Sequence, residues 1–170
     1  MNIKKYIREI PDWPKKGVNF KDITPLLQNP EAFSHAVHSL TAPYKKNKPD
    51  VVVGIDARGF ILAAPVALAL GASLVLIRKK GKLPYKTISI KYNLEYGTNE
   101  IEIHNDAIKK GQKILIVDDV LATGGTMKAA TMLVNKLSGK IIGISFLINL
   151  TFLNGQKKLH KFNITSVIDY

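Results

Sequence analysis

Short apolar runs alternate with helical patterns along most of this chain. The predicted strands 51–55 and 113–117 are apolar runs with many β-branched residues, the second after Lys113, which is typical of strands buried on both faces. Strands followed by helices of this kind indicate βαβ units and a parallel sheet. The same patterns predict further strands at 74–77, 141–148 and 164–168, and helices at 31–46, 60–70 and 126–137.

Two other segments have a different pattern. Residues 87–92 and 99–103 alternate apolar and polar positions, which predicts a half-exposed hairpin around 95–97. Residues 11–30 hold four of the eight prolines and predict an ordered but irregular segment. We therefore expect one doubly wound, mainly parallel α/β domain over residues 1–170, with an N-terminal hood over about 1–30 and a hairpin lid over about 78–104.

The longest uncharged stretch runs from Phe60 to Ile77 and is long enough to be tested as a membrane span. Pro65, Gly71 and Ser73 interrupt it, so we interpret it as a buried helix, a stop at Gly71 and a buried strand. The N-terminus lacks the apolar core of a secretory signal. The absence of cysteine excludes disulfides and thiolate chemistry. We expect a cytoplasmic protein with no membrane contact.

The net charge of +12 favours anionic partners, either nucleic acid or a polyphosphate substrate. The lysines are scattered and no nucleic-acid-binding motif accompanies them. A solvated, lysine-rich surface is therefore the preferred interpretation, and no nucleic-acid partner is expected.

The most specific pattern covers residues 114–126. Asp118 and Asp119 follow an apolar strand, and adjacent carboxylates are acceptors suited to the vicinal hydroxyls of a ribose. A loop with two glycines then leads into a helix, whose first N–H groups and dipole favour a phosphate. Together these features predict a ribose 5-phosphate site. Its loop residues are Ala122, Thr123, Gly124, Gly125 and Thr126.

Other phosphate-binding motifs do not fit. No Gly-Lys-Ser/Thr ends the loop, as a Walker A motif requires, and the glycine spacing is not that of a dinucleotide-binding fold. The segment instead resembles the motif for phosphoribosyl pyrophosphate (PRPP) in the type I phosphoribosyltransferases. Three further stretches, Gly17–Leu26, Asp56–Phe60 and Ile77–Pro84 continuing to Leu94–Gly97, resemble the adenine-specific branch of that family.

The resemblance implies a role for each of these stretches. Asp56–Gly59 is similar to the pyrophosphate loop, which in the family often contains a non-proline cis peptide bond. Phe20 in the hood could pack on a purine, although core packing explains it equally well. Glu95 at the lid tip is the expected group for proton handling, with a solvated carboxylate as the alternative. The implied pyrophosphate ligands are Ala57, Arg58, Gly59, Arg78, Lys79 and Lys82, with Arg58 also catalytic, and the implied adenine contacts are Asn19, Phe20 and Lys21.

The implied reaction is displacement of pyrophosphate from PRPP by a purine nitrogen, with Mg²⁺ held by pyrophosphate and ribose oxygens. Enzymes for 6-oxopurines resemble this motif but carry Asp at the position of Ala122, so adenine is the expected base and AMP the expected product. Two alternatives stay open: a xanthine phosphoribosyltransferase, and a regulator of the same fold that senses PRPP and binds nucleic acid. A homodimer is also implied.

Overall fold

The computed structural model describes residues 1–93 and 98–170, and its chain divides into two compact units, Met1–Ser39 and Leu40–Tyr170. The first unit extends beyond the predicted hood of about residues 1–30. The division of the chain into one domain with a hood and a lid stays a prediction.

The first unit is more regular than predicted. Strand β1 (Arg8–Ile10) pairs antiparallel with β2 (Phe20–Asp22), and the short helix α1 (Thr24–Gln28) follows. The interpretation of 11–30 as irregular throughout is therefore wrong, because prolines in the connecting turn concealed a strand and a helix. The remaining elements are the 3₁₀ turn η1 (Ile3–Tyr6) and helix α2 (Pro30–Thr41), whose last residues belong to the second unit.

The predicted helix at 31–46 is too long. Helix α2 ends at Thr41 and a 3₁₀ turn, η2 (Ala42–Tyr44), replaces its last turn. Pro43 lies inside that turn; because proline has no N–H to donate, it ends the α-helical hydrogen-bond pattern.

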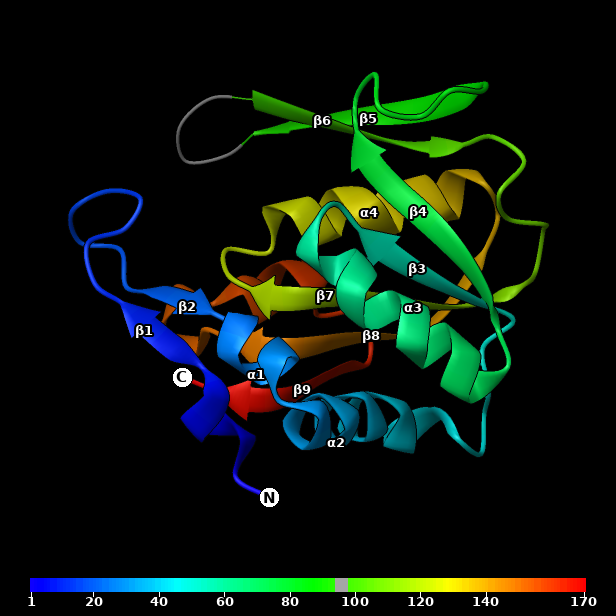
Figure 1. The fold of residues 1–170 in the computed structure, drawn as a ribbon. Helices are drawn as coiled ribbons and strands as arrows, with labels where there is room; N and C mark the ends of the chain where they lie inside the picture. Colours follow the sequence, from blue (N-terminus) through cyan, green and yellow to red (C-terminus); the bar gives the residue numbers. More distant parts are fainter. Residues whose placement is uncertain (94–97) are drawn as a thin grey trace. The chain divides into compact units, whose positions relative to one another are not determined.

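The second unit is built on a seven-stranded sheet in the order β5-β6-β4-β3-β7-β8-β9 (Figure 1). Strands β4, β3, β7, β8 and β9 are parallel, and β6 joins β4 and β5 antiparallel. This confirms the predicted mainly parallel sheet and the hairpin. The strands are β3 (Val51–Ile55), β4 (Ser73–Lys79), β5 (Thr87–Asn93), β6 (Thr98–His104), β7 (Lys113–Leu121), β8 (Lys140–Asn149) and β9 (Ile164–Asp169).

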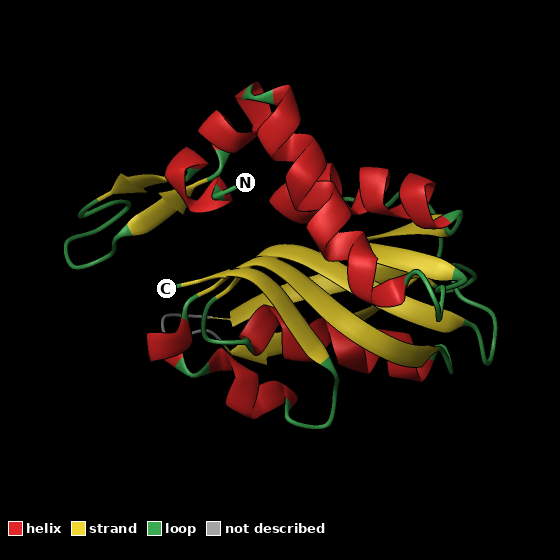
Figure 2. Cartoon of the chain, turned by 90° about the horizontal axis from the view of Figure 1, so that it is seen from below, coloured by secondary structure: helices red, strands yellow, loops and turns green. Residues whose placement is uncertain are grey.

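Helices cover both faces of the sheet (Figure 2), as a doubly wound fold requires. Helix α3 (Arg58–Leu70) packs on β3, β4 and β7, and helix α4 (Gly125–Lys136) packs on β5, β6 and β8. Gly71, with φ +67°, ends α3, so residues 60–77 form a helix, a stop and a strand as predicted. No helix among the described residues is long and apolar enough to cross a membrane. Two 3₁₀ turns, η3 (Thr151–Leu153) and η4 (Gly155–Leu159), connect β8 to β9.

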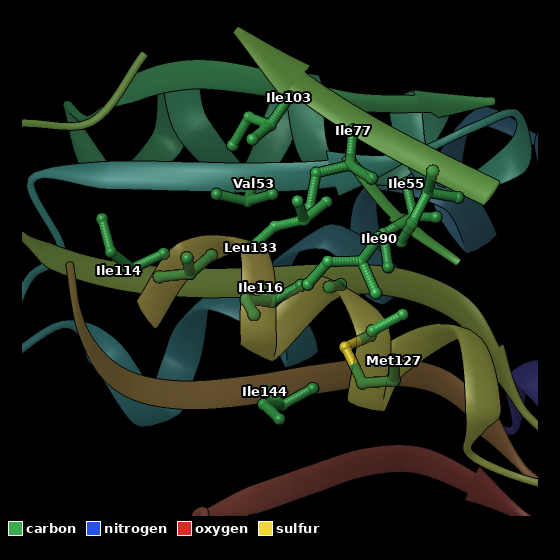
Figure 3. Packing of buried hydrophobic residues seen from close by; sticks show 14 of the residues in the cluster. Val53, Ile55, Ile77, Ile90, Ile103, Ile114, Ile116, Met127, Leu133 and Ile144 are labelled. Atoms are coloured by element: carbon green, nitrogen blue, oxygen red, sulfur yellow. The ribbon is translucent and has the colours of Figure 1, made fainter. Parts of the chain in front are cut away.

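The main apolar core lies between the sheet and α4 (Figure 3). Ile116 and Ile144 of the central strands and Leu133 of α4 are fully buried there. Burial of each such side chain contributes about 1.5–3 kcal/mol relative to exposure. Because this core runs beneath the carboxyl ends of β3 and β7, it gives the loops that follow them a rigid base.

Candidate active site

Three loops meet where the parallel strands end: 56–57 after β3, 80–86 after β4 and 122–124 after β7. Ligands of such folds lie beyond the carboxyl ends of the strands. A Cβ atom on Gly59, at the start of α3, would lie 2.6 Å from Oδ1 of Asp118. The first turn of α3 is therefore directly against the acidic pair on β7, and Gly59 allows this close approach.

The acidic pair lies within β7, which continues to Leu121, rather than just beyond the strand as predicted. The N–H of Asp119 donates to Oδ1 of Asp118 at 2.9 Å, and Nη2 of Arg58 lies 2.7 Å from Oδ2 of Asp119. Asp118, Val120 and Leu121 pair with β8, which fixes the backbone on both sides of Asp119.

Burial raises the pKa of both carboxyls in the ligand-free protein. For Asp118 the shift is large, because the neighbouring charge of Asp119 adds to the effect of burial. For Asp119 the Arg58 guanidinium opposes the effect of burial and leaves a smaller rise in its pKa. A ligand that donates hydrogen bonds to this pair, or brings a cation to it, would stabilise the ionised form.

The loop after β7 has the geometry of an anion cradle. Gly124 adopts φ +77° and caps α4, which starts at Gly125. The first N–H groups of a helix have no partner within the helix and attract anions. The hydroxyl of Thr126 lies 3.1 Å from that of Tyr92 on β5, so the hairpin contacts the start of α4.

Gly155 lies behind this loop and was missed in the sequence. A Cβ on Gly124 would lie 2.5 Å from the carbonyl oxygen of Gly155, and a Cβ on Gly155 would overlap the carbonyl oxygen of Ala122. The two backbones therefore touch where neither residue can carry a side chain. No spacing rule connects positions so far apart in the sequence.

The predicted pyrophosphate ligands lie in different surroundings. The Asp56–Ala57 peptide bond is cis. Arg78 donates from Nε to Oδ2 of Asp56 at 3.3 Å and from Nη1 to the carbonyl oxygen of Lys82 at 3.0 Å, which connects the loops after β3 and β4. The side chains of Lys79 and Lys82 are exposed. Arg58 faces Asp119, on the side of the predicted ribose site.

The three predicted adenine contacts lie in the first unit. Nδ2 of Asn19 donates to Oε2 of Glu9 at 2.7 Å, and the buried Nζ of Lys21 lies 2.8 Å from the same oxygen. The rings of Trp13 and Phe20 pack edge to face, 4.4 Å apart. Because the side chains of Asn19 and Lys21 are bonded to Glu9, the main-chain groups of residues 19–21 are more available to a ligand than these two side chains. Glu95, the predicted catalytic carboxylate, lies outside the described residues.

The fold, and the acidic pair followed by a phosphate cradle, define the phosphoribosyltransferase class. The family comparison agrees. The chain belongs to the phosphoribosyl transferase domain family, whose model matches residues 22–169. It is similar over its full length to proteins named adenine phosphoribosyltransferase. The relative from Acetivibrio thermocellus is 53% identical over 171 residues, covering 100% of both chains, and that from Halothermothrix orenii is 56% identical over 168 residues, covering 99% of each.

Solved structures show the same relationship. Adenine phosphoribosyltransferase from Thermoanaerobacter pseudethanolicus matches with a TM-score of 0.96 at 50% identity, covering 99% of this chain and 98% of that one. The enzyme from Giardia lamblia, complexed with 9-deazaadenine, matches with a TM-score of 0.95 at 36% identity, covering 99% and 96%. The type I phosphoribosyltransferase fold predicted from the sequence is thereby confirmed.

Proposed function

We propose that this chain is an adenine phosphoribosyltransferase of purine salvage, which transfers the 5-phosphoribosyl group of PRPP to adenine and forms AMP and pyrophosphate. The observation that carries the proposal is the pair of carboxylates on β7, the half-buried Asp118 and the buried Asp119, directly before the glycine-capped start of α4. Full-length similarity to proteins named for this reaction supports the choice of base.

Each loop has one task in the proposed reaction. Asp118 and Asp119 accept hydrogen bonds from the ribose hydroxyls, and residues 122–126 bind the 5-phosphate. Residues 57–59, at the start of α3, bind the pyrophosphate together with Arg78, Lys79 and Lys82. Guanidinium groups suit this task because their planar donors match phosphate oxygens.

The chemical step breaks the bond from C1′ to the pyrophosphate oxygen and forms the bond from C1′ to adenine N9, which loses its proton. A cation-like ribosyl carbon needs no covalent nucleophile. The residues therefore act by positioning the two reactants and by neutralising the departing charge. Asn19, Phe20 and Lys21 contact adenine, largely through main-chain groups, and Glu95 handles the proton.

The residues of the second unit fit a magnesium ion that is bound through the substrate. Among residues 1–93 and 98–170, no group of three or more His, Cys, Asp or Glu side chains could hold a metal by itself. Mg²⁺ usually keeps several waters and binds through substrate phosphates and one or two carboxylates. A magnesium ion held by pyrophosphate and ribose oxygens would supply positive charge next to Asp118 and Asp119, whose pKa values are raised by burial.

A homodimer is part of the proposal. The outer side of α3 and the start of β4 expose the apolar side chains of Ile61, Leu68 and Leu74, of which Leu68 is 84% exposed. Exposed apolar surface of this kind marks interaction sites. A second copy of the chain covers it, and light scattering of the wild type beside Leu68→Glu tests this: a dimer that dissociates in the variant is expected. A cytoplasmic location is also part of the proposal, since a chain without cysteine fits a reducing compartment.

The test of the reaction uses purified protein, PRPP and Mg²⁺ with adenine, hypoxanthine, guanine or xanthine, and follows pyrophosphate release. Release with adenine, much faster than with the other bases, is expected, because Ala122 has no carboxylate for the N7 proton of an oxopurine. Faster release with xanthine would favour the xanthine enzyme. PRPP binding without release, together with tight and sequence-dependent RNA or DNA binding across salt, would favour the regulator.

A further inference from the structure

Glu102 on β6 is a buried carboxylate that the proposed reaction does not use. Its side chain is only 2% exposed, although glutamate is almost never buried without partners. It lies directly opposite Arg78 in the antiparallel pairing of β6 with β4. Directly opposed residues point to the same face of a sheet, so Glu102 faces the side from which Arg78 projects.

Three consecutive backbone N–H groups converge on one oxygen of Glu102. The N–H groups of Gly81, Lys82 and Leu83 donate to Oε1 at 2.9, 3.1 and 3.1 Å. The hydroxyl of Thr87 donates to Oε2 at 3.1 Å, and Nζ of Lys80 lies 3.4 Å from Oε2. The loop after β4 therefore wraps around a carboxylate from a strand that follows it in the sequence.

The carboxylate is held in its ionised form. Burial by itself raises the pKa of Glu102, but hydrogen bonds from Leu83, Thr87, Lys80 and Gly81 outweigh burial and bring the pKa below its ordinary value. Hydrogen bonds to a charged acceptor are the stronger kind. The loop Lys80–Leu83 is therefore ordered by side-chain to backbone contacts in addition to its own turn.

The contacts continue from this loop to the predicted pyrophosphate site. The carbonyl oxygen of Lys82 accepts from Nη1 of Arg78 at 3.0 Å, and Nε of Arg78 donates to Asp56 at 3.3 Å. Asp56 directly precedes the pyrophosphate loop 57–59. Any movement of the Lys82 backbone thus changes where the Arg78 guanidinium lies.

We propose that Glu102 is a positioning residue for pyrophosphate: it holds the loop Lys80–Leu83 so that Arg78 and Lys82 present their charges to the leaving group. This inference rests on the proposed function, because it gives Glu102 a role in shaping a loop that binds pyrophosphate in that reaction. Glu102 itself touches no substrate.

The negative charge of Glu102, acting alone, would have the opposite effect on pyrophosphate binding. Glu102 is negative and lies beside cationic residues that would bind an anion. If it acted only through its charge, its removal would strengthen pyrophosphate binding. If it acts by positioning, its replacement by neutral glutamine weakens binding, because the three N–H groups then share an amide oxygen in place of an ionised acceptor, and hydrogen bonds to a charged acceptor are the stronger kind.

The test compares Glu102→Gln with Glu100→Gln. Glu100 lies two positions earlier on the same strand, is half-buried, and its side chain accepts from the Ser89 hydroxyl at 2.6 Å. Its backbone carbonyl accepts from the N–H of Lys80 at 3.0 Å, a bond that Glu100→Gln leaves in place. Calorimetry with pyrophosphate and Mg²⁺, and the KM for PRPP and for adenine, are measured for both variants. We expect Glu102→Gln to weaken pyrophosphate binding and raise the KM for PRPP by about tenfold, with little change in the KM for adenine. Glu100→Gln should change each constant by less than about twofold.

A second readout needs no activity. Amide hydrogen exchange of the ligand-free protein should show faster exchange at Gly81, Lys82 and Leu83 in Glu102→Gln and wild-type exchange there in Glu100→Gln. Unchanged exchange, or pyrophosphate binding as tight as in the wild type or tighter, would overturn the inference. If Glu102→Gln does not fold, Thr87→Val supplies the test, because it removes one bond to the carboxylate and should raise the KM for PRPP by about threefold. Failure of the wild type to release pyrophosphate with any base would reject the proposed function instead.

Discussion

The loop after β7 and the loop after β4 are both expected to bind phosphate groups, but they are built differently. The loop after β7 is shaped by its own residues: Gly124 in a left-handed conformation and the start of α4 at Gly125. The loop after β4 is shaped from outside, because Glu102 of a later strand accepts three of its N–H groups. One anion site is local in the sequence, and the other is assembled by the sheet.

The two loops leave different traces in the sequence. A local cradle leaves a motif, because the glycines, threonines and helix start must follow one another. An assembled loop leaves only scattered charges, and its organising residue is indistinguishable from any other glutamate in an alternating strand. Four substitutions test the comparison, in order of decreasing expected effect.

The largest effect is expected from Asp118→Asn in the local site. Loss of an ionised acceptor for a ribose hydroxyl should lower kcat/KM for PRPP by about 100-fold. The folded pKa of Asp118 is raised, so the folded state binds more protons than the unfolded state, and the ionised carboxyl destabilises the fold as pH rises through its folded pKa. Asn should therefore raise the Tm at neutral and alkaline pH while it lowers activity.

The measurement is thermal unfolding of the wild type and Asp118→Asn from pH 3 to pH 9. The gain in Tm should grow with pH and vanish below the ordinary carboxyl pKa, where Asp118 is protonated in both states. A gain that is independent of pH, or a loss of stability at pH 8, would contradict the assigned cause.

The next effect is expected from Gly155→Ala, which tests the backbone contact behind the same loop. The added methyl would overlap the Ala122 carbonyl oxygen and lie 3.1 Å from the N of Gly124. Overpacking of this kind costs about 1–3 kcal/mol of stability. The KM for PRPP should rise by about tenfold, which steady-state kinetics would measure. Gln156→Ala, at the exposed next position, is the control and should change neither the KM nor the Tm.

A smaller effect is expected from Tyr92→Phe, which removes the hydrogen bond between Tyr92 of the hairpin and Thr126. A neutral hydrogen bond contributes about 0.5–1.5 kcal/mol. The KM for PRPP should rise by about threefold, and a double-mutant cycle with Thr126→Ala should show that the two changes are not additive. Full additivity would mean that the hairpin and the cradle act independently.

The smallest effect is expected from Lys80→Met, which separates the ion pair of Glu102 from its backbone bonds. The Lys80 side chain is half-exposed and its Nζ lies 3.4 Å from Glu102, so the pair contributes little. The equilibrium constant of unfolding, measured in urea, and the KM for PRPP, measured by steady-state kinetics, should each change by less than about twofold. A loss as large as that expected for Glu102→Gln would mean that the ion pair, and not the three N–H groups, orders the loop.

Most of the second unit could be predicted, and the errors have physical causes. The strand Val51–Ile55 has its predicted bounds, because an apolar run ends where Asp56 follows. The strand predicted at 113–117 continues to Leu121, because pairing with β8 keeps Asp118 and Asp119 extended despite their charge. The strand and helix hidden in 11–30 were missed, because a strand that pairs across a proline-rich turn has no pattern of its own.

By itself, the sequence determined the alternation of buried strands and helices, the acidic pair with its glycine cradle, and through them the family. These features depend on neighbouring residues, and neighbours are visible in a sequence. The tertiary structure alone decided the contact of Gly155 with Ala122, the hydrogen bond from Tyr92 to Thr126 and the wrapping of a loop around Glu102. Each joins groups that are distant in the chain and meet only because a sheet brings its strands side by side, so the information lies in the packing and not in any local pattern.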